Sequence, residues 1–250
     1  MTSVSSRDVA RLLDLVGEGM EARGNEAFPP VVLTMLAGLI PSDAYVGYQE
    51  GDVSGRFRVL ELVEVVGEPV SPALEEAYVA LGHQNPHRCR LRARERRVLR
   101  LSDSMSRRTR QRLDYYTSVW RPLGIEDSLR LWLPAPDGRA TTIYLERSGR
   151  NYSDREKTLL ALLRPQLIRI QRVRETRRRV GRLAELTARE AEILAHVAEG
   201  QTNRQIARTL FISPHTVRTH LEHIFEKLGV QTRAAAVALW SGAGGAGREA

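Results

Sequence analysis

Residues 203–230 read NRQIARTLFISPHTVRTHLEHIFEKLGV and contain two apolar patterns of helical spacing, separated by a break. The break is Ser213-Pro214, where the serine can accept hydrogen bonds from the first backbone N–H groups of a helix. A proline fits the first helical position, which needs no N–H donor. Gly229 is the residue type expected just past a helix end. The stretch therefore predicts a helix, a tight turn and a second helix.

The second predicted helix, 214–228, has an apolar face and a polar face. The apolar stripe consists of Val217, Leu221, Ile224 and Leu228, and the opposite face carries His215, Arg218, Thr219 and Glu222. An arginine can contact both acceptors of a guanine, and a threonine methyl group can contact thymine. The polar face therefore suits the reading of base edges, and a merely solvated face of a helical bundle is the alternative.

Further helix start signals lie on both sides of this stretch. Thr187 with Glu190 forms a capping-box pattern, and Thr202 with Gln205 repeats it. Thr232 is placed to cap a last, alanine-rich helix. The C-terminal region is thus expected to be an all-α module of four short helices.

This module resembles the DNA-binding domain of the LuxR/NarL family of bacterial transcription regulators. The resemblance is carried by LTAREAEIL at 186–194, NRQIA at 203–207, ISPHTVRTHL at 212–221 and KLGV at 227–230, followed by Thr-Arg-Ala. It covers roughly a fifth of the chain. It implies that the helix 214–228 lies in the major groove of double-stranded DNA, that the protein is a homodimer, and that RNA polymerase is a candidate partner.

The resemblance also implies roles for single residues. DNA contacts are expected from Arg218, Thr219, Glu222, His215, Thr202, Asn203, Lys227 and Arg233, and dimer contacts from Ala235, Val237 and Ala238. Glu222 departs from the basic residue common in the family at its position. An acid there can accept from cytosine or exclude other bases.

Residues 1–150 predict an α+β domain with helices at both ends of a roughly five-stranded antiparallel sheet. Helices are expected within 5–23, 29–43, 71–83 and 113–124, a strand pair within 44–67, a strand at 96–103 and a hairpin over 127–149. Val, Tyr and alternating Leu residues mark these strands, and PAPDG forms the hairpin turn.

The order of LIPSD at 39–43, the YYxxVWRPLG pattern at 115–124 and LxLPAPxGR at 131–139 resembles GAF-like or PAS-like sensor domains of actinobacterial LuxR-type regulators. The strand and helix alternation of a phosphorelay receiver is absent, and residues 40–90 do not reproduce the constellation of acyl-homoserine-lactone sensors. The resemblance implies a small-molecule effector. Pocket candidates are Tyr45, Tyr116, Trp120 and Trp132, with Tyr48, Tyr115 and Tyr144 as further aromatics and simple core packing as the alternative.

Two other roles stay open for the N-terminal domain: a small-molecule enzyme, or a module for protein interaction and dimerisation. No phosphate loop, nucleophile elbow or paired-carboxylate motif is visible, so we expect no enzymatic activity, no catalytic residues and no cofactor. His83, His87 and Cys89 could ligate a metal on one helical face, but Pro86 disfavours such a helix, and no metal site is expected.

Basic residues concentrate in two segments of this 250-residue chain of net charge +8. Residues 88–112 hold 11 arginines and two acids, and residues 150–186 hold 11 basic and 4 acidic residues. The second segment falls in a long helix predicted from Asp154 to about Arg182, and its arginines are candidates for flanking DNA phosphates or for solvation alone. The expected organisation is a sensor domain over 1–150, a basic linker helix over 151–185, the helix-turn-helix domain over 186–241 and a flexible tail over 242–250.

No secretory signal or membrane span is predicted, because charged residues interrupt the start and the longest apolar run, 31–40, is too short for a bilayer. The single cysteine excludes an intramolecular disulfide and fits a reducing compartment. We therefore expect a cytoplasmic protein without membrane partners.

Overall fold

The computed structural model describes the chain except residues 1–3, 25, 53–57, 90–96, 135–138 and 245–250. The chain divides into two compact units, Met1–Arg172 and Val173–Ala250. Within the described part, the helices fall short of the length and apolarity that a bilayer crossing requires.

The N-terminal unit contains one five-stranded antiparallel sheet in the order β2-β1-β5-β4-β3. The strands are β1 Tyr45–Asp52, β2 Arg58–Val66, β3 Leu99–Arg100, β4 Asp127–Pro134 and β5 Arg139–Arg147. The predicted strand pair and hairpin are therefore confirmed, and so is the α+β class of this unit.

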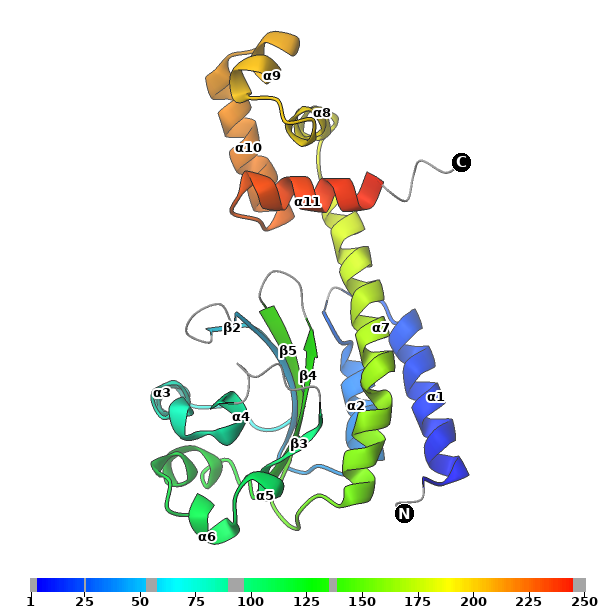
Figure 1. The fold of residues 1–250 in the computed structure, drawn as a ribbon, viewed down its shortest axis with the longest axis vertical. Coiled ribbons are helices and arrows are strands. Elements are labelled where there is room, and N and C mark those ends of the chain that lie inside the picture. Colours follow the sequence, from blue (N-terminus) through cyan, green and yellow to red (C-terminus); the bar gives the residue numbers. More distant parts are fainter. Residues whose placement is uncertain (1–3, 25, 53–57, 90–96, 135–138, 245–250) are drawn as a thin grey trace. The chain divides into compact units, whose positions relative to one another are not determined.

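Helices cover both faces of the sheet (Figure 1). One side carries α1 Ser6–Glu21, α2 Pro30–Leu39 and the N-terminal part of α7 Asp154–Ala184. The other side carries α3 Pro72–Ala80, α4 Pro86–Cys89, α6 Arg107–Arg110, the 3-10 turn η1 Gly82–Gln84 and the short π-helix η3 Tyr116–Trp120, with α5 Leu101–Ser104 near the sheet edge. The sheet is thus the middle of three layers.

The alternating leucines of β4 lie on the face of the sheet that packs against α2 and α7. Leu129, Leu131 and Leu133 are buried in a core shared with α2 and α7. Successive residues point to the opposite face, where Arg130 and Trp132 lie. This second face is covered by α3 and η3, whose aromatic residues form a separate cluster.

One detail of the predicted N-terminal domain was wrong. The strand expected at 96–103 is only two residues long, because Leu101 begins α5. The buried carboxylate of Asp127 accepts a hydrogen bond from the backbone N–H of Ser102 at 3.0 Å. This N–H belongs to the first turn of α5 and has no partner within the helix, so Asp127 helps to start the helix at this point. The helix expected over 113–124 is present as a shorter helical segment, 114–120, which includes the π-helix η3 and ends before Pro122.

The helix α7 ends at Ala184, close to its predicted end at about Arg182. In its first half Leu159, Leu160 and Leu163 are buried, whereas Leu162 is 51% exposed. Buried leucines of the first half of α7 belong to the core of the N-terminal unit, and the boundary between the two compact units falls inside α7 at 172/173.

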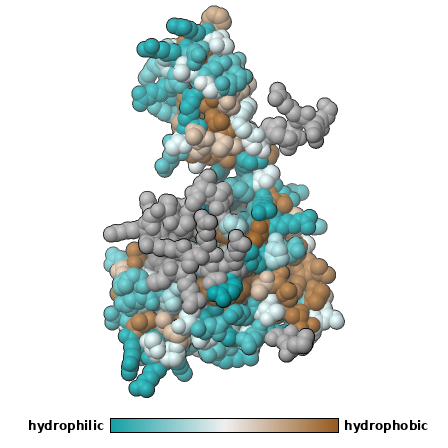
Figure 2. Space-filling model, in the orientation of Figure 1, coloured by the Kyte–Doolittle hydropathy of each residue, from teal (hydrophilic) through white to brown (hydrophobic). Residues whose placement is uncertain are grey.

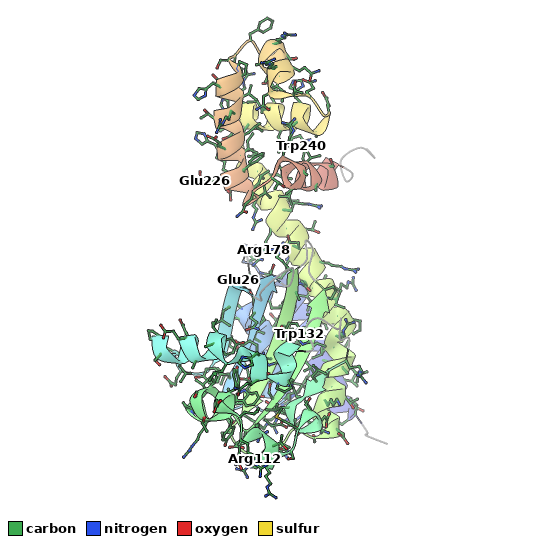
Figure 3. All side chains as sticks on the ribbon, turned by 60° about the vertical axis from the view of Figure 1, so that its left-hand side comes forward. Glu26, Arg112, Trp132, Arg178, Glu226 and Trp240 are labelled. Carbon is green, nitrogen blue, oxygen red and sulfur yellow. The ribbon has the colours of Figure 1, made fainter. Side chains whose placement is uncertain are left out.

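The C-terminal unit contains the four predicted short helices, which are α8 Ala188–Ala198, α9 Asn203–Thr209, α10 Pro214–Leu228 and α11 Arg233–Gly244. Both predicted capping boxes are present, Thr187 with Glu190 and Thr202 with Gln205. Trp240, labelled on α11 in Figure 3, packs against the core of this unit. The predicted tail overlaps the end of α11, and residues 245–250 lie outside the described part.

Candidate nucleic-acid interface and effector pocket

The orientation of α10 is fixed at both ends and along one side. Ser213 accepts from the backbone N–H of Thr216 at 3.0 Å, and Pro214 occupies the first turn. Gly229 ends the helix with φ 64° and ψ 37°, a left-handed conformation that glycine adopts without strain. The predicted stripe of Val217, Leu221, Ile224 and Leu228 is buried. The opposite face of α10 is therefore held toward solvent.

That face carries four polar residues spaced i, i+3, i+4 and i+7, namely His215, Arg218, Thr219 and Glu222. Arg218 Nε lies 3.0 Å from Glu222 Oε1, with side-chain exposures of 73% and 59%. The Thr219 hydroxyl donates to the His215 carbonyl at 3.3 Å. Since Arg218 and Glu222 cancel in charge, the face offers hydrogen-bonding groups but little electrostatic attraction.

Four other predicted DNA contacts are engaged inside the C-terminal unit. The Thr202 hydroxyl belongs to the capping box of α9 and donates to Gln205 at 2.8 Å. Arg233 donates to Asn203 Oδ1 at 3.3 Å and to the Gln201 carbonyl. Lys227 forms a 2.7 Å ion pair with Glu190. These residues hold α8, α9, α10 and α11 together, so a DNA role for them stays a prediction.

The Glu190–Lys227 pair joins the start of α8 to the end of α10. Burial alone would raise the pKa of Glu190. Hydrogen bonds from Lys227 and from the backbone N–H and the side chain of Thr187 outweigh this effect and lower the pKa to about 2. The pKa in the unfolded chain is near 4.5. The bond therefore contributes its full stability above about pH 4.5 and loses it as the pH falls toward about 2.

Replacing Lys227 by methionine should destabilise the C-terminal unit by about 1–3 kcal/mol at pH 7, because Glu190 loses its charged donor. The difference from the wild-type chain should shrink as the pH falls below about 4.5. Amide hydrogen exchange of α8 across pH measures this. The exposed pair Arg189–Glu192 supplies the control, since Glu192→Gln should change stability by less than about 0.5 kcal/mol. A Lys227→Met effect equally large at pH 3 would contradict the assignment.

Three exposed residues near α10 were not singled out from the sequence. Arg204 and Arg208 on α9 are exposed, and their side chains form no hydrogen bond or ion pair with another residue of the described part. Phe211, in the turn before α10, is 95% exposed and has φ 55°, an uncommon value for a non-glycine residue. The two arginines are suited to phosphate contacts, and lone surface arginines carry no pattern that a sequence search would detect.

The predicted dimer residues occupy different sides of α11. Ala238 is exposed, whereas Ala235 and Val237 are half-buried and Val237 packs partly against the core of its own unit. Ala236 is fully buried. The free face of α11 is lined by Ala234 and Ala238, so it is smooth and made of small side chains.

Arg179 and Arg182 of the basic segment each donate to a carbonyl at the end of a helix. Arg179 donates to the Gly242 carbonyl at 2.6 Å, near the end of α11. Arg182 donates to the Leu228 carbonyl at 3.2 Å, at the end of α10. Both therefore place a cation at a helix C-terminus, where the backbone dipole favours it.

In the N-terminal unit, a cavity of about 320 Å³ lies between the second face of the sheet and the helices α3 and η3. Two of the four predicted pocket residues, Tyr45 and Trp120, line it. Tyr116 instead donates to Glu126 at 2.8 Å, and Trp132, labelled in Figure 3, comes from β4 outside the lining. Of the further aromatics, Tyr115 and Tyr144 line it, and Tyr48 belongs to the core on the other face.

A metal site was not expected, and among the described residues no three His, Cys, Asp or Glu side chains are grouped to hold one. His83 lies in η1, and His87 lies in α4 beyond Pro86. The side chain of Cys89 is outside the described part.

Comparison with known proteins assigns the C-terminal unit. Residues 184–240 match the family model for bacterial regulatory proteins of the luxR family. A probable transcriptional regulatory protein SgaR of Hyphomicrobium methylovorum is 56% identical over 57 residues, 23% of this chain and 27% of that protein. A probable transcriptional regulatory protein NarL of Mycobacterium tuberculosis is 53% identical over 53 residues, 21% of this chain and 24% of that protein. This chain thus spans about a quarter of the length of these curated relatives.

Solved structures match the architecture over longer stretches. The VqsR LBD domain of Pseudomonas aeruginosa is 19% identical with a TM-score of 0.50, covering 68% of this chain and 98% of that one. SdiA in complex with octanoyl-rac-glycerol is 17% identical with a TM-score of 0.52, covering 96% of each chain. At this identity the match concerns the fold alone, which is an N-terminal α+β domain followed by a helical C-terminal module.

Proposed function

Because residues 184–240 are a helix-turn-helix domain of the LuxR family, we propose that the protein is a DNA-binding transcriptional regulator whose helix α10 reads the major groove. The observation that carries this proposal is the exposed face of α10, which presents Arg218, Thr219 and Glu222 beside a turn that ends in a capped helix N-terminus. Backbone N–H groups at such a terminus also suit a DNA phosphate.

Each residue of the face has a role in this proposal. Arg218 leaves Glu222 and donates to the two acceptors of a guanine, and Glu222 accepts from a neighbouring cytosine. The Thr219 methyl group contacts thymine. Arg204 and Arg208 neutralise phosphates and set the register of α10 in the groove.

The protein acts as a homodimer in this proposal, because one α10 offers too few base contacts for selective binding. The small side chains of Ala234 and Ala238 allow two copies of α11 to pack closely. The operator then has two-fold related half-sites about one helical turn apart. RNA polymerase is the partner through which such a regulator acts on transcription.

We propose that the N-terminal unit is the effector domain and that its ligand binds in the cavity between the sheet and the helices α3 and η3. SdiA, whose fold is similar, has been solved with octanoyl-rac-glycerol, which supports a small-molecule role. We assign no catalytic function, since the relatives of the C-terminal unit are regulators by name.

An interaction module is the second candidate for the N-terminal unit. Figure 2 shows hydrophobic residues on the side of this unit where α1 lies, and Val9 and Leu13 of α1 are 47% and 67% exposed. A patch of this kind suits contact with another protein surface.

The test of the proposed function is binding of the full chain to operator DNA recovered from a random-sequence library, measured by fluorescence anisotropy and sedimentation. We expect a complex of two chains per operator and no specific binding after deletion of residues 186–250. A complex with one chain on one asymmetric half-site would overturn the dimer proposal.

A further inference from the structure

The floor of the N-terminal cavity contains buried hydrogen-bond donors that lack acceptors. Arg130 is 4% exposed and donates through Nη2 to Glu146 at 2.8 Å, but its Nε and Nη1 have no partner. Gln49 is also buried, and its Oε1 accepts from Tyr78 at 3.3 Å while its Nε2 has no partner. Both side chains line the cavity. Since unsatisfied buried donors are costly, this floor is suited to an acceptor oxygen of a ligand.

The mouth of the cavity carries carboxylates, which accept hydrogen bonds, where the floor carries donors. Glu64 on β2 and Glu75 on α3 line it and are exposed, as are the apolar side chains of Leu62 and Val79, at 54% and 69%. Glu64 accepts from the Tyr144 hydroxyl at 2.6 Å. Neither carboxylate forms an ion pair with a cation in the described part of the chain, although the charge of Arg130 acts on Glu64 from the cavity floor.

The charges of the lining do not balance. Three carboxylates, those of Glu64, Glu75 and Glu146, face the single guanidinium of Arg130. Partial burial raises the pKa of Glu64, and the charge of Glu146 adds to this, whereas the hydrogen bond from Tyr144 and the charge of Arg130 act in the opposite direction. Since Glu146 is already paired with Arg130, the surplus negative charge lies at the mouth.

Aromatic rings fill the space between floor and mouth. Tyr45, Tyr78, Tyr115, Tyr144 and Trp120 line the cavity, and Tyr115 and Trp120 pack edge to face at 4.8 Å. Such rings accommodate a flat apolar body and also attract a cation through their faces.

We propose that this cavity binds a monocationic small molecule that carries a carbonyl oxygen at its buried end, an apolar or aromatic body, and an ammonium group at the mouth. The carbonyl accepts from Arg130 and Gln49, and the ammonium lies between Glu64 and Glu75. The inference rests on the proposed effector role of the N-terminal unit and adds the class of ligand. A neutral amphiphile leaves the mouth carboxylates unpaired, and an anionic ligand is repelled by them.

Three probes with the same aromatic body separate the two recognition elements. 4-(Aminomethyl)benzamide has both groups, 4-ethylbenzamide has only the carbonyl, and 4-ethylbenzylamine has only the cation. Calorimetry on the full chain should show saturable binding of the first probe at one molecule per chain, at least about 10-fold tighter than either of the others. Equal affinities, a tightest neutral probe or no saturable binding would overturn the proposal.

Two substitutions locate the probe in the cavity. Gln49→Met should weaken both amides about 5-fold and leave the amine probe unchanged, because only the amides use the Nε2 donor. Glu75→Gln should weaken the two cationic probes about 5-fold, whereas Glu76→Gln, an exposed neighbour on α3 outside the lining, should have no effect. Identical behaviour of the two glutamate variants would contradict the assignment of the ammonium group. Thermal melting confirms that each variant is folded.

DNA binding without probe separates this inference from the proposed function. If the chain binds its operator but no probe, the ligand class is wrong and the regulator proposal stands. If the probes bind as expected but DNA does not, the regulator proposal fails and the ligand site stands.

Discussion

Replacing Arg218 by alanine is expected to weaken binding to the recovered operator by about 1–3 kcal/mol, or about 5- to 150-fold, with little change on random DNA. The loss is sequence-dependent because a bidentate contact to guanine has no equivalent on other base pairs. In the free protein Arg218 is paired with Glu222 at 3.0 Å, so the guanidinium is already held on the reading face. Anisotropy titrations on both DNAs measure the two losses.

Arg208→Ala is the matched control for this prediction. Arg208 is exposed on α9 and is assigned to a phosphate, so its loss should affect operator and random DNA to the same degree. An equal loss on both DNAs for Arg218→Ala would make Arg218 a phosphate contact and would contradict base reading by this face.

Replacing both Arg177 and Arg178 by glutamine is expected to flatten the slope of log affinity against log salt by up to about 1.8 units, because each phosphate contact contributes about 0.9. Residues 187–241 hold 6 basic and 5 acidic residues, whereas 150–186 hold 11 and 4, so α7 is the main source of positive charge near the DNA module in the sequence. Operator and random DNA should weaken alike, and base preference should survive. Arg179 is left intact because it holds the Gly242 carbonyl.

The control for the salt slope is Arg7→Gln with Arg11→Gln, two exposed arginines of α1 in the N-terminal unit. This variant has the same net charge and should keep the wild-type slope. If the Arg177 and Arg178 variant also keeps that slope, these arginines solvate the helix and do not contact phosphates.

The C-terminal unit could be predicted from the sequence nearly residue by residue, because its signals are local. A capping residue and its partner are three positions apart, as in Thr187 and Glu190, and one glycine ends α10. The buried stripe of α10 followed from helical periodicity alone. The ion pair of Glu190 with Lys227 did not, since it joins residues 37 positions apart.

The N-terminal unit was predictable in class but not in detail. Its strands showed alternation, yet the end of β3 depends on Asp127, which lies 25 residues from Ser102. The cavity is built in the same non-local way, since Gln49 and Arg130 meet only after β1, β5 and β4 pair. Aromatic content suggested Tyr45 and Trp120, but it could not indicate that Trp132 lies outside the lining.

Sequence-specific DNA binding by α10 is tested most directly by capture of genomic DNA fragments with the full chain, followed by sequencing. We expect the enriched fragments to share a two-fold symmetric motif with half-sites about one helical turn apart. The chain lacking residues 186–250 should enrich none of them. Fragments without a common motif, or the same enrichment by the truncated chain, would contradict sequence-specific DNA binding by α10.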